Sequence, residues 1–168
     1  LSDGYFILPY TMQNYLSAQI GVPRFSPDAP EFMEAEKQIR EKINRLMAIN
    51  GKQTVDSIHR RLGLIMWNKV GMARNEKGLK EAIEEIKALR KEFWQDVKVP
   101  ATSGMNNELE KALRVADFLE MGELMARDAL MRNESCGGHF REEFQTPDGE
   151  AMRNDAEYSF VAAYEYQG

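Results

Sequence analysis

Residues 107–142 read NELEKALRVADFLEMGELMARDALMRNESCGGHFRE, and they predict the longest helix of the chain. Apolar and small residues recur every three or four positions, which is the period of one helix face. Asn106 or Asn107 is suited to start this helix. Small side chains on the face allow a neighbouring helix to approach closely. The face consists of Leu109, Ala112, Val115, Leu119, Gly122, Ala126 and Ala129.

The last part of this stretch, RNESCGGHFREEF at residues 132–144, predicts the end of the helix and a reversal of the chain. We expect the helix to end near Glu134 or Ser135. Gly137 or Gly138 would then adopt the left-handed conformation that stops a helix, because glycine has no Cβ to oppose it. The turn would bring Arg132, His139 and Arg141 together at one end of a helical bundle.

Two kinds of chemistry are conceivable for this turn, and the sequence supports neither. Cys136 and His139 have a spacing that zinc tolerates, but a structural zinc site needs four ligands. The only other histidine, His59, is about eighty residues away and is expected to be a surface or packing residue. A Cys–His nucleophilic pair would need an orienting group and oxyanion donors, which cannot be named here. We therefore predict no catalytic, cofactor-binding or metal-binding residue in this chain.

Three further helices are predicted before the long one. The first runs from Pro30 to Asn50, and the second from its N-cap Thr54 to about Arg74. The third has the clearest apolar period and ends near Val97. Because the connections between helices are short, neighbouring helices are expected to be antiparallel.

The two ends of the chain have a different character. Residues 1–20 are rich in apolar and aromatic side chains, with a helix expected from Pro9 to about Ile20 and closed by Gly21. This segment is too apolar for an isolated element, so we expect it to pack on a domain outside the chain. In EYSFVAAYEY, residues 157–166, alternating aromatics predict a β-strand. The chain begins without Met and stops soon after this run, which predicts an excised piece of a longer polypeptide.

The predicted fold is mainly α: an antiparallel bundle of three to four long helices with a C-terminal tail containing a β-strand. Residues 1–29 form a segment and connector, 30–135 the bundle, and 136–168 the turn and tail. A net charge of −5 argues against a nucleic-acid binder, and the single cysteine excludes an internal disulfide and fits a reducing, cytoplasmic setting. The sequence contains no membrane-length apolar run and no glycine-rich nucleotide motif.

Three stretches together resemble a known family: RRLGLIMWNKVGMAR at 60–74, the long stretch at 107–142, and RNDAEYSFVAAYEY at 153–166. They are similar to the C-terminal region of the flavoprotein subunit of succinate dehydrogenase and fumarate reductase. That family carries an Arg-x-Glu-Ser-Arg-Gly-x-His run at the end of a long helix. The places of this run are filled here by Arg132, Glu134, Ser135, Gly137 and His139, and Cys136 replaces the family's second arginine.

The resemblance implies a role in succinate–fumarate interconversion, within the tricarboxylic acid cycle and electron transport. In the family, a hydride passes between the substrate and FAD, and electrons then reach an iron–sulfur subunit and a membrane cytochrome b/quinone subunit. This places the complex at the inner face of the cytoplasmic membrane. The family's FAD and substrate residues would all precede Leu1, so the chain alone is expected to be structural and inactive.

The resemblance also implies a role for the turn: it would form a seam facing the FAD-binding domain of the same subunit. The expected docking motif consists of Arg132, Glu134, Ser135, Gly137, His139 and Arg141. Two alternatives are the C-terminal domain of L-aspartate oxidase, which has a similar Glu-Ser-Arg-Gly run, and a free-standing helical interaction module. The segment MWNKVG at 66–71 and the aromatic run at 157–166 favour the succinate/fumarate type.

Overall fold

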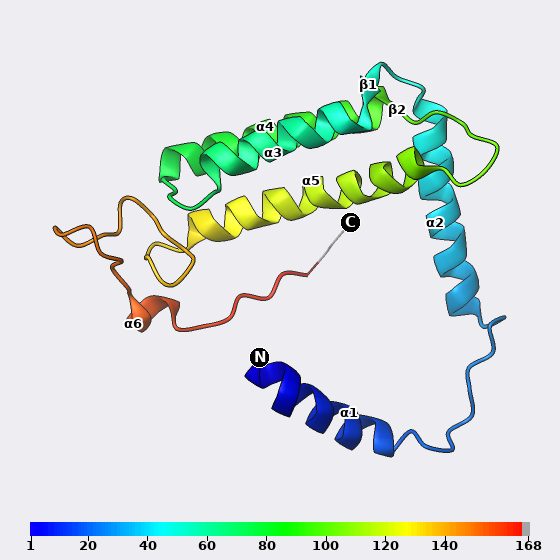
Figure 1. Cartoon of the computed structure of the whole chain (residues 1–168), viewed down its shortest axis with the longest axis horizontal. Coiled ribbons are helices and arrows are strands. Elements are labelled where there is room, and N and C mark those ends of the chain that lie inside the picture. The colour runs from blue at the N-terminus through cyan, green and yellow to red at the C-terminus, as the bar shows by residue number, and fades with distance from the viewer. Residues whose placement is uncertain (166–168) are drawn as a thin grey trace. The chain divides into compact units, whose positions relative to one another are not determined.

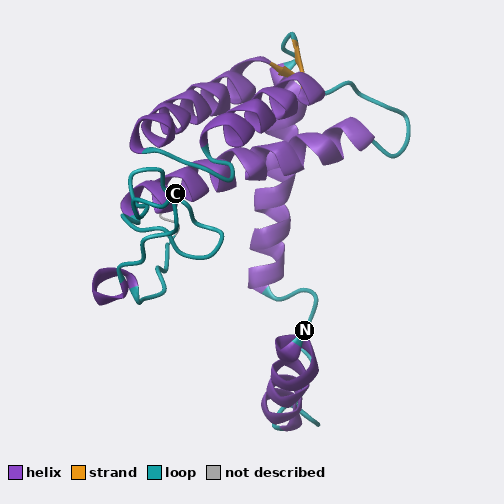
Figure 2. Ribbon diagram, turned by 60° about the vertical axis from the view of Figure 1, so that its left-hand side comes forward, coloured by secondary structure: helices purple, strands orange, loops and turns teal. Residues whose placement is uncertain are grey.

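The computed structural model describes residues 1–165 of the chain (Figure 1). It is mainly helical, which confirms the predicted class (Figure 2). The chain divides into two units, Leu1–Arg40 and Glu41–Gly168, which are described separately below. No helix in the described part of the chain is both long enough and apolar enough to span a membrane.

Unit 1 contains short helices that bury none of their side chains. A π-helix, η1 (Asp3–Ile7), continues into α1 (Leu8–Ser17), and the first half of α2 (Pro30–Ile49) follows. The helix therefore begins before Pro9 and ends at Ser17, not near Ile20. Gly21 follows with a φ of 83°, in the left-handed region that favours glycine. No residue of η1 or α1 is buried, although many of them are apolar.

Unit 2 is built around three long helices, α3 (Val55–Lys69), α4 (Glu76–Asp96) and α5 (Asn107–Met131). Each begins with a side-chain cap of the kind that satisfies a free N–H of the first turn. Thr54 Oγ1 accepts from Ser57 N at 3.1 Å, and Asn106 Oδ1 accepts from Leu109 N at 3.0 Å. Both caps confirm the sequence prediction. Asn75 caps α4 in the same way.

The second predicted helix is shorter than expected. It ends at Lys69 and not near Arg74, because the backbone of Arg74 pairs outside the helix. Arg74 N donates to Phe140 O at 3.1 Å, and Glu142 N donates to Arg74 O at 2.7 Å. The connection between α3 and α4 is therefore bonded to the turn that follows α5.

The chain reverses direction between consecutive helices, so α4 is antiparallel to both α3 and α5, while α3 and α5 run in the same direction (Figure 1). Their shared core includes Ile58, Ile86, Phe93 and Leu119, all fully buried. A Cβ atom added at Gly122 would lie 3.2 Å from the sulfur of Met66. A larger residue at this position would require Met66 to shift by a few tenths of an ångström, so the glycine helps α3 to pack closely against α5.

A short backbone pairing closes one end of the bundle. Strand β1 (Gln53–Thr54) pairs in parallel with β2 (Val97–Lys98). Beside it, Gly51 N donates to Val97 O at 3.0 Å. A Cβ at Gly51 would lie only 2.0 Å from the backbone oxygen of Asp96, so no larger residue fits without moving the chain.

The predicted strand in the C-terminal tail is wrong over the residues that the structure describes. Residues Asp155–Tyr158 form a short helix, α6, and no strand occurs from 159 to 165. Tyr166 lies outside the described residues. Tyr158 N instead donates to Asn154 O at 3.0 Å, and no neighbouring segment forms a ladder with the aromatic run as far as residue 165. Alternation alone does not make a strand when there is no partner edge.

Candidate functional site

The turn at 132–144 begins earlier than the sequence predicted. Helix α5 ends at Met131, and Arg132 is already extended with φ −87° and ψ 97°, so an end near Glu134 or Ser135 is wrong. Gly137 does adopt a left-handed φ of 58°, but it lies beyond the helix in a tight reversal. There, Cys136 N donates to His139 O at 2.8 Å, and His139 N donates to Cys136 O at 3.1 Å.

A distant arginine, and not a glycine, satisfies the end of α5. Arg141 Nη1 donates to Ala129 O at 3.0 Å and to Leu130 O at 3.2 Å. These carbonyls belong to the last turn of the helix, where no backbone N–H is available to bond them. The positive charge also suits the negative end of the helix dipole.

Arg141 is one of the most completely enclosed side chains in the molecule, with 2% of its surface exposed. Its Nε donates to Glu143 Oε2 at 3.1 Å, which supplies a compensating charge. The guanidinium lies over the ring of Phe144, 5.4 Å from the ring centroid. A buried charge of this kind is tolerated only when it is paired and hydrogen-bonded, and Arg141 meets both conditions.

Ser135 locks the backbone of Arg141 in place. The Ser135 side chain is fully buried. Its hydroxyl accepts from Arg141 N at 2.8 Å and donates to Arg141 O at 3.1 Å, so both roles of the group are used. Ser135 N also donates to Met152 O at 2.9 Å, which ties the turn to the tail.

Glu134 is equally enclosed, with 1% of its surface exposed. Its Oε2 accepts from Asn154 N at 2.8 Å, and its Oε1 accepts from Arg132 Nε at 2.7 Å. The backbone N–H of Asn154 is the main reason that the pKa of Glu134 lies below its ordinary value, and the Arg132 guanidinium adds to the effect. The carboxylate is thus held in its charged form by groups of its own chain.

His139 lies between the end of α5 and the α3–α4 connection. Its Nε2 is 2.9 Å from Arg132 O, and its Nδ1 is 3.1 Å from Arg74 Nη1. A carbonyl only accepts and a guanidinium only donates, so Nε2 carries the proton and Nδ1 accepts. Burial lowers the pKa of His139, and the positive charges of Arg74, Arg132 and Arg141 lower it further.

The structure thus brings together all of the predicted docking residues, but they differ in burial. Glu134, Ser135 and Arg141 are enclosed by their own chain. His139 is partly open and Gly137 is exposed. Sequence reasoning missed Arg74, because it lies 65 residues from its partner His139 and carries no local signal of the contact. Within residues 1–165, no cluster of three His, Cys, Asp or Glu side chains is placed to hold a metal.

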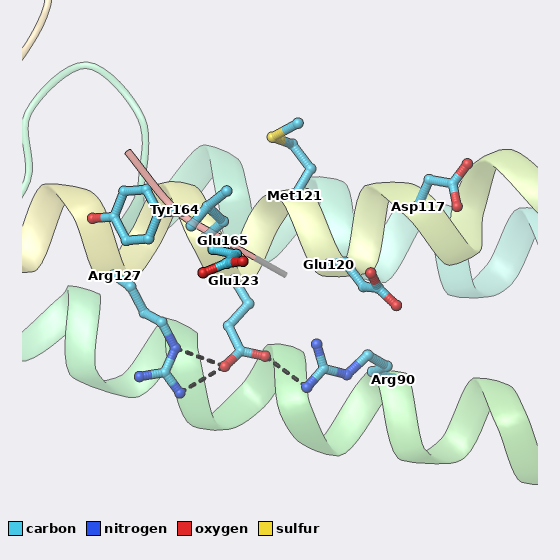
Figure 3. A pocket seen from close by; sticks show the side chains of 9 residues that line it. Arg90, Asp117, Glu120, Met121, Glu123, Arg127, Tyr164 and Glu165 are labelled. Atoms are coloured by element: carbon cyan, nitrogen blue, oxygen red, sulfur yellow. Dashed lines mark hydrogen bonds and ion pairs between the residues drawn. The ribbon is translucent and has the colours of Figure 1, made fainter. Parts of the chain in front are cut away.

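A second polar arrangement lies on α4 and α5 (Figure 3). The nearly buried carboxylate of Glu123 is 2.7 Å from Arg127 Nη2 and 2.8 Å from Arg90 Nη2. Glu123 lines an open groove with a volume of about 600 Å³. The lining consists of Arg90, Asp117, Glu120, Met121, Glu123, Leu124, Arg127, Tyr164 and Glu165. Carboxylates outnumber guanidinium groups there, and both arginines are already paired with Glu123.

Comparison with known proteins defines the class of this helical domain. Residues 59–168 match the family described as the fumarate reductase flavoprotein C-terminus. A relative from Methanothermobacter marburgensis, a fumarate reductase (CoM/CoB) polypeptide, is 33% identical over 111 residues, which cover 66% of this chain and 19% of the relative. The Helicobacter pylori fumarate reductase flavoprotein subunit is 29% identical over 160 residues, covering 95% of this chain and 22% of the relative.

The same fold occurs in a solved quinol–fumarate reductase with menaquinol molecules. The TM-score is 0.67 at 22% identity, covering 83% of this chain and 23% of the solved chain. The chain therefore belongs to the family of C-terminal domains of succinate dehydrogenase and fumarate reductase flavoprotein subunits. It spans about a fifth of the length of the curated relatives that it matches.

Proposed function

We propose that this chain is the structural, non-catalytic helical domain of an FAD-dependent subunit that interconverts succinate and fumarate. The family membership and the names of the relatives support the activity of the whole subunit. Those names are fumarate reductase and succinate dehydrogenase, which favours this reading over L-aspartate oxidase. When bound, FAD would accept the hydride that leaves succinate.

One observation carries the non-catalytic assignment: the polar groups of the turn are occupied by one another. Both ring nitrogens of His139 are bonded, to Arg132 O and to Arg74. Both carboxylate oxygens of Glu134 accept hydrogen bonds from their own chain. A general acid or base must reach its substrate, and neither side chain has a free position from which to do so.

The groove on α4 and α5 does not suit FAD itself. A pyrophosphate is bound by free backbone N–H groups at a helix N-terminus or by unpaired cations. The groove on α4 and α5 offers instead an excess of carboxylates, and its two arginines are engaged by Glu123. We therefore assign FAD, and the residues that bind the dicarboxylate, to the remainder of the subunit.

We further propose how this domain contacts its partners. The apolar segment within residues 1–29, including Tyr5, Phe6, Ile7 and Leu8, would pack on the FAD-binding domain of the same subunit, because exposed apolar side chains in such number mark an interface. The turn within 136–168 would lie at the same boundary, and residues 30–135 would form the bundle. An iron–sulfur subunit and a membrane cytochrome b/quinone subunit would complete the complex at the inner face of the cytoplasmic membrane.

The test uses the full-length flavoprotein subunit that contains this chain. His139→Gln is compared with the matched control His59→Gln by measuring succinate-dependent dye reduction per bound flavin. Turnover per flavin should be unchanged in both variants, even where His139→Gln lowers the yield of assembled subunit. A severe loss of turnover in a stable, fully flavinylated His139→Gln subunit would contradict the structural role. Reduction by L-aspartate and not by succinate would instead identify an L-aspartate oxidase.

A further inference from the structure

We propose that His139 is a pH-sensitive latch: when neutral it holds the turn at 132–144 to the connection between α3 and α4, and when protonated it releases it. This connection, residues 70–75, leads from the end of α3 to the start of α4. The proposal concerns the conformation of this domain and does not depend on the reaction of the whole subunit.

The geometry of the ring suits the neutral form. Nδ1 accepts a hydrogen bond from Arg74 Nη1 at 3.1 Å, and Nε2 donates to Arg132 O at 2.9 Å. Protonation would place an N–H on Nδ1, directly facing an N–H of the Arg74 guanidinium. The contact would then join two donors and two positive charges, so it would change from attractive to repulsive.

Burial is the largest influence against a charged ring, the hydrogen bond to Arg132 O acts in the opposite direction, and three positive charges add to the effect of burial. Arg74 faces His139 from the α3–α4 connection, Arg132 from the end of α5, and Arg141 from the turn itself. All three charges disfavour an imidazolium. Burial disfavours it because the ring would lose hydration on charging.

The nearby carboxylates do not offset these charges at the ring. Glu134 accepts from Arg132 and from Asn154 N, and Glu143 accepts from Arg141. Asp128 of α5 favours the charge on Arg74 and accepts from the Tyr164 hydroxyl at 2.9 Å. In the described part of the chain, none of these carboxylates bonds the imidazole.

The release would be confined to one junction. Arg74 would keep the bond from Nε to Gly71 O at 3.0 Å, so the connection would stay folded. The two backbone bonds between Arg74 and residues 140 and 142 would be left without the side-chain contact that supports them. Asn75 Nδ2 donates to Glu142 Oε2 at 2.7 Å and Glu76 N donates to Glu143 Oε1, and these bonds would still hold the end of the turn to the start of α4. The turn would therefore open around His139 while α3, α4 and α5 remained packed.

The sign of the pH effect follows from the lowered pKa of His139. The stabilisation is complete above the ordinary pKa of 6.5 and is lost as the pH falls through 6.5 towards the lower folded value. Within that window, the equilibrium constant for opening should rise as the pH falls, by at most about tenfold for each unit of pH.

The test is an NMR titration of the imidazole resonances in the full 168-residue chain, which contains two histidines. His139 should titrate below pH 6.5, and Arg74→Gln should move its midpoint upward because the facing charge is removed. His59→Gln should leave the His139 titration unchanged. A His139 midpoint at or above 6.5, or a midpoint that Arg74→Gln does not move, would overturn the latch.

Hydrogen exchange gives a second readout that does not depend on resonance assignment. Between pH 7.5 and 5.0, after correction for the intrinsic rate, amides at 132–144 should lose protection while those in α4 keep it. In His139→Gln, which cannot titrate, this pH-dependent loss should disappear. An equal loss in His139→Gln and in the unsubstituted chain would show that another group controls the junction.

Discussion

The turn at 132–144 and the first helical segment, η1 with α1, show opposite relations between sequence and burial. The turn is polar, yet Glu134, Ser135 and Arg141 are almost completely enclosed. The first segment is apolar, yet none of its residues is buried, and Tyr5 and Phe6 have 75% and 73% of their surfaces exposed. Burial is therefore decided by the partners that a residue finds, and not by its polarity alone.

The two regions obtain their stability from different sources. Every hydrogen bond described for the enclosed polar side chains of the turn is made to another residue of this chain. No residue of the first segment is buried within unit 1, so unit 1 by itself gives its apolar groups little stabilisation. Substitutions in the two regions should accordingly have very different effects.

The largest effect is expected for Arg141→Met. This change keeps much of the volume but leaves Ala129 O and Leu130 O without donors and Glu143 without its cation. The free energy of unfolding should fall by about 3 kcal/mol, measured by urea denaturation. The matched control is Arg114→Met, an exposed arginine of α5 that pairs with Glu110, which should cost less than about 0.5 kcal/mol. Equal losses would show that the α5 end is not stabilised as described.

A smaller loss is expected for Ser135→Ala, because it removes one hydroxyl that both donates and accepts. The unfolding free energy should fall by about 1–2 kcal/mol, since Arg141 N and O would be left unbonded in a buried place. Ser103→Ala, in the exposed loop before α5, is the control and should change nothing measurable. An unchanged free energy of unfolding in Ser135→Ala would contradict this role and would mean that water replaces the hydroxyl.

Glu134→Gln tests the same region through pH. The lowered pKa means that the carboxylate stabilises the fold fully above about pH 4.5, and that this contribution is lost as the pH falls through the folded value. At pH 7 the variant should melt about 3 °C lower than the unsubstituted chain. The difference should shrink towards pH 3, measured by thermal scans. A difference independent of pH, or the same behaviour in the exposed Glu157→Gln, would contradict the assignment.

The smallest effect is expected for Phe6→Ser in the first segment. Because the side chain is exposed, the unfolding free energy should change by no more than about 0.5 kcal/mol. We expect the exposed apolar surface of this segment to cause self-association, and sedimentation velocity should show less of it in the variant, since one apolar group has been removed. A loss above about 1 kcal/mol would show that this segment packs within the chain, and the contrast with the turn would fail.

Structural features that depend on neighbouring residues were predictable from the sequence, and contacts between residues far apart in the chain were not. The caps Thr54 and Asn106 were predicted because each bonds an N–H three residues away. The end of α5 was misjudged because its carbonyls are satisfied by Arg141, about ten residues further on, and no local glycine is needed. The contact between Arg74 and His139 crosses 65 residues and could be found only in three dimensions.

The C-terminal tail was also mispredicted for lack of long-range information, here because a local pattern was present and its partner strand was not. Its alternating aromatics are the pattern of a strand, but a strand also requires an unpaired edge beside it. The position of the family motif was predicted more closely. The resemblance placed Arg132, Glu134, Ser135 and His139 at one turn after the long helix, and in the structure they lie in the turn after α5. The resemblance did not show that most of these groups bond one another.

The pairing of β1 with β2 has a consequence for the order of folding. The two segments lie 44 residues apart, and the whole α3–α4 hairpin is the loop between them. Closing so long a loop in an unfolded chain costs entropy that two parallel residue pairs cannot repay. The ladder can therefore form only after the helical hairpin has brought its ends together, and the close approach at Gly51 belongs to the last stage of folding. Its strength would then set how slowly the native chain unfolds, and not how fast it folds.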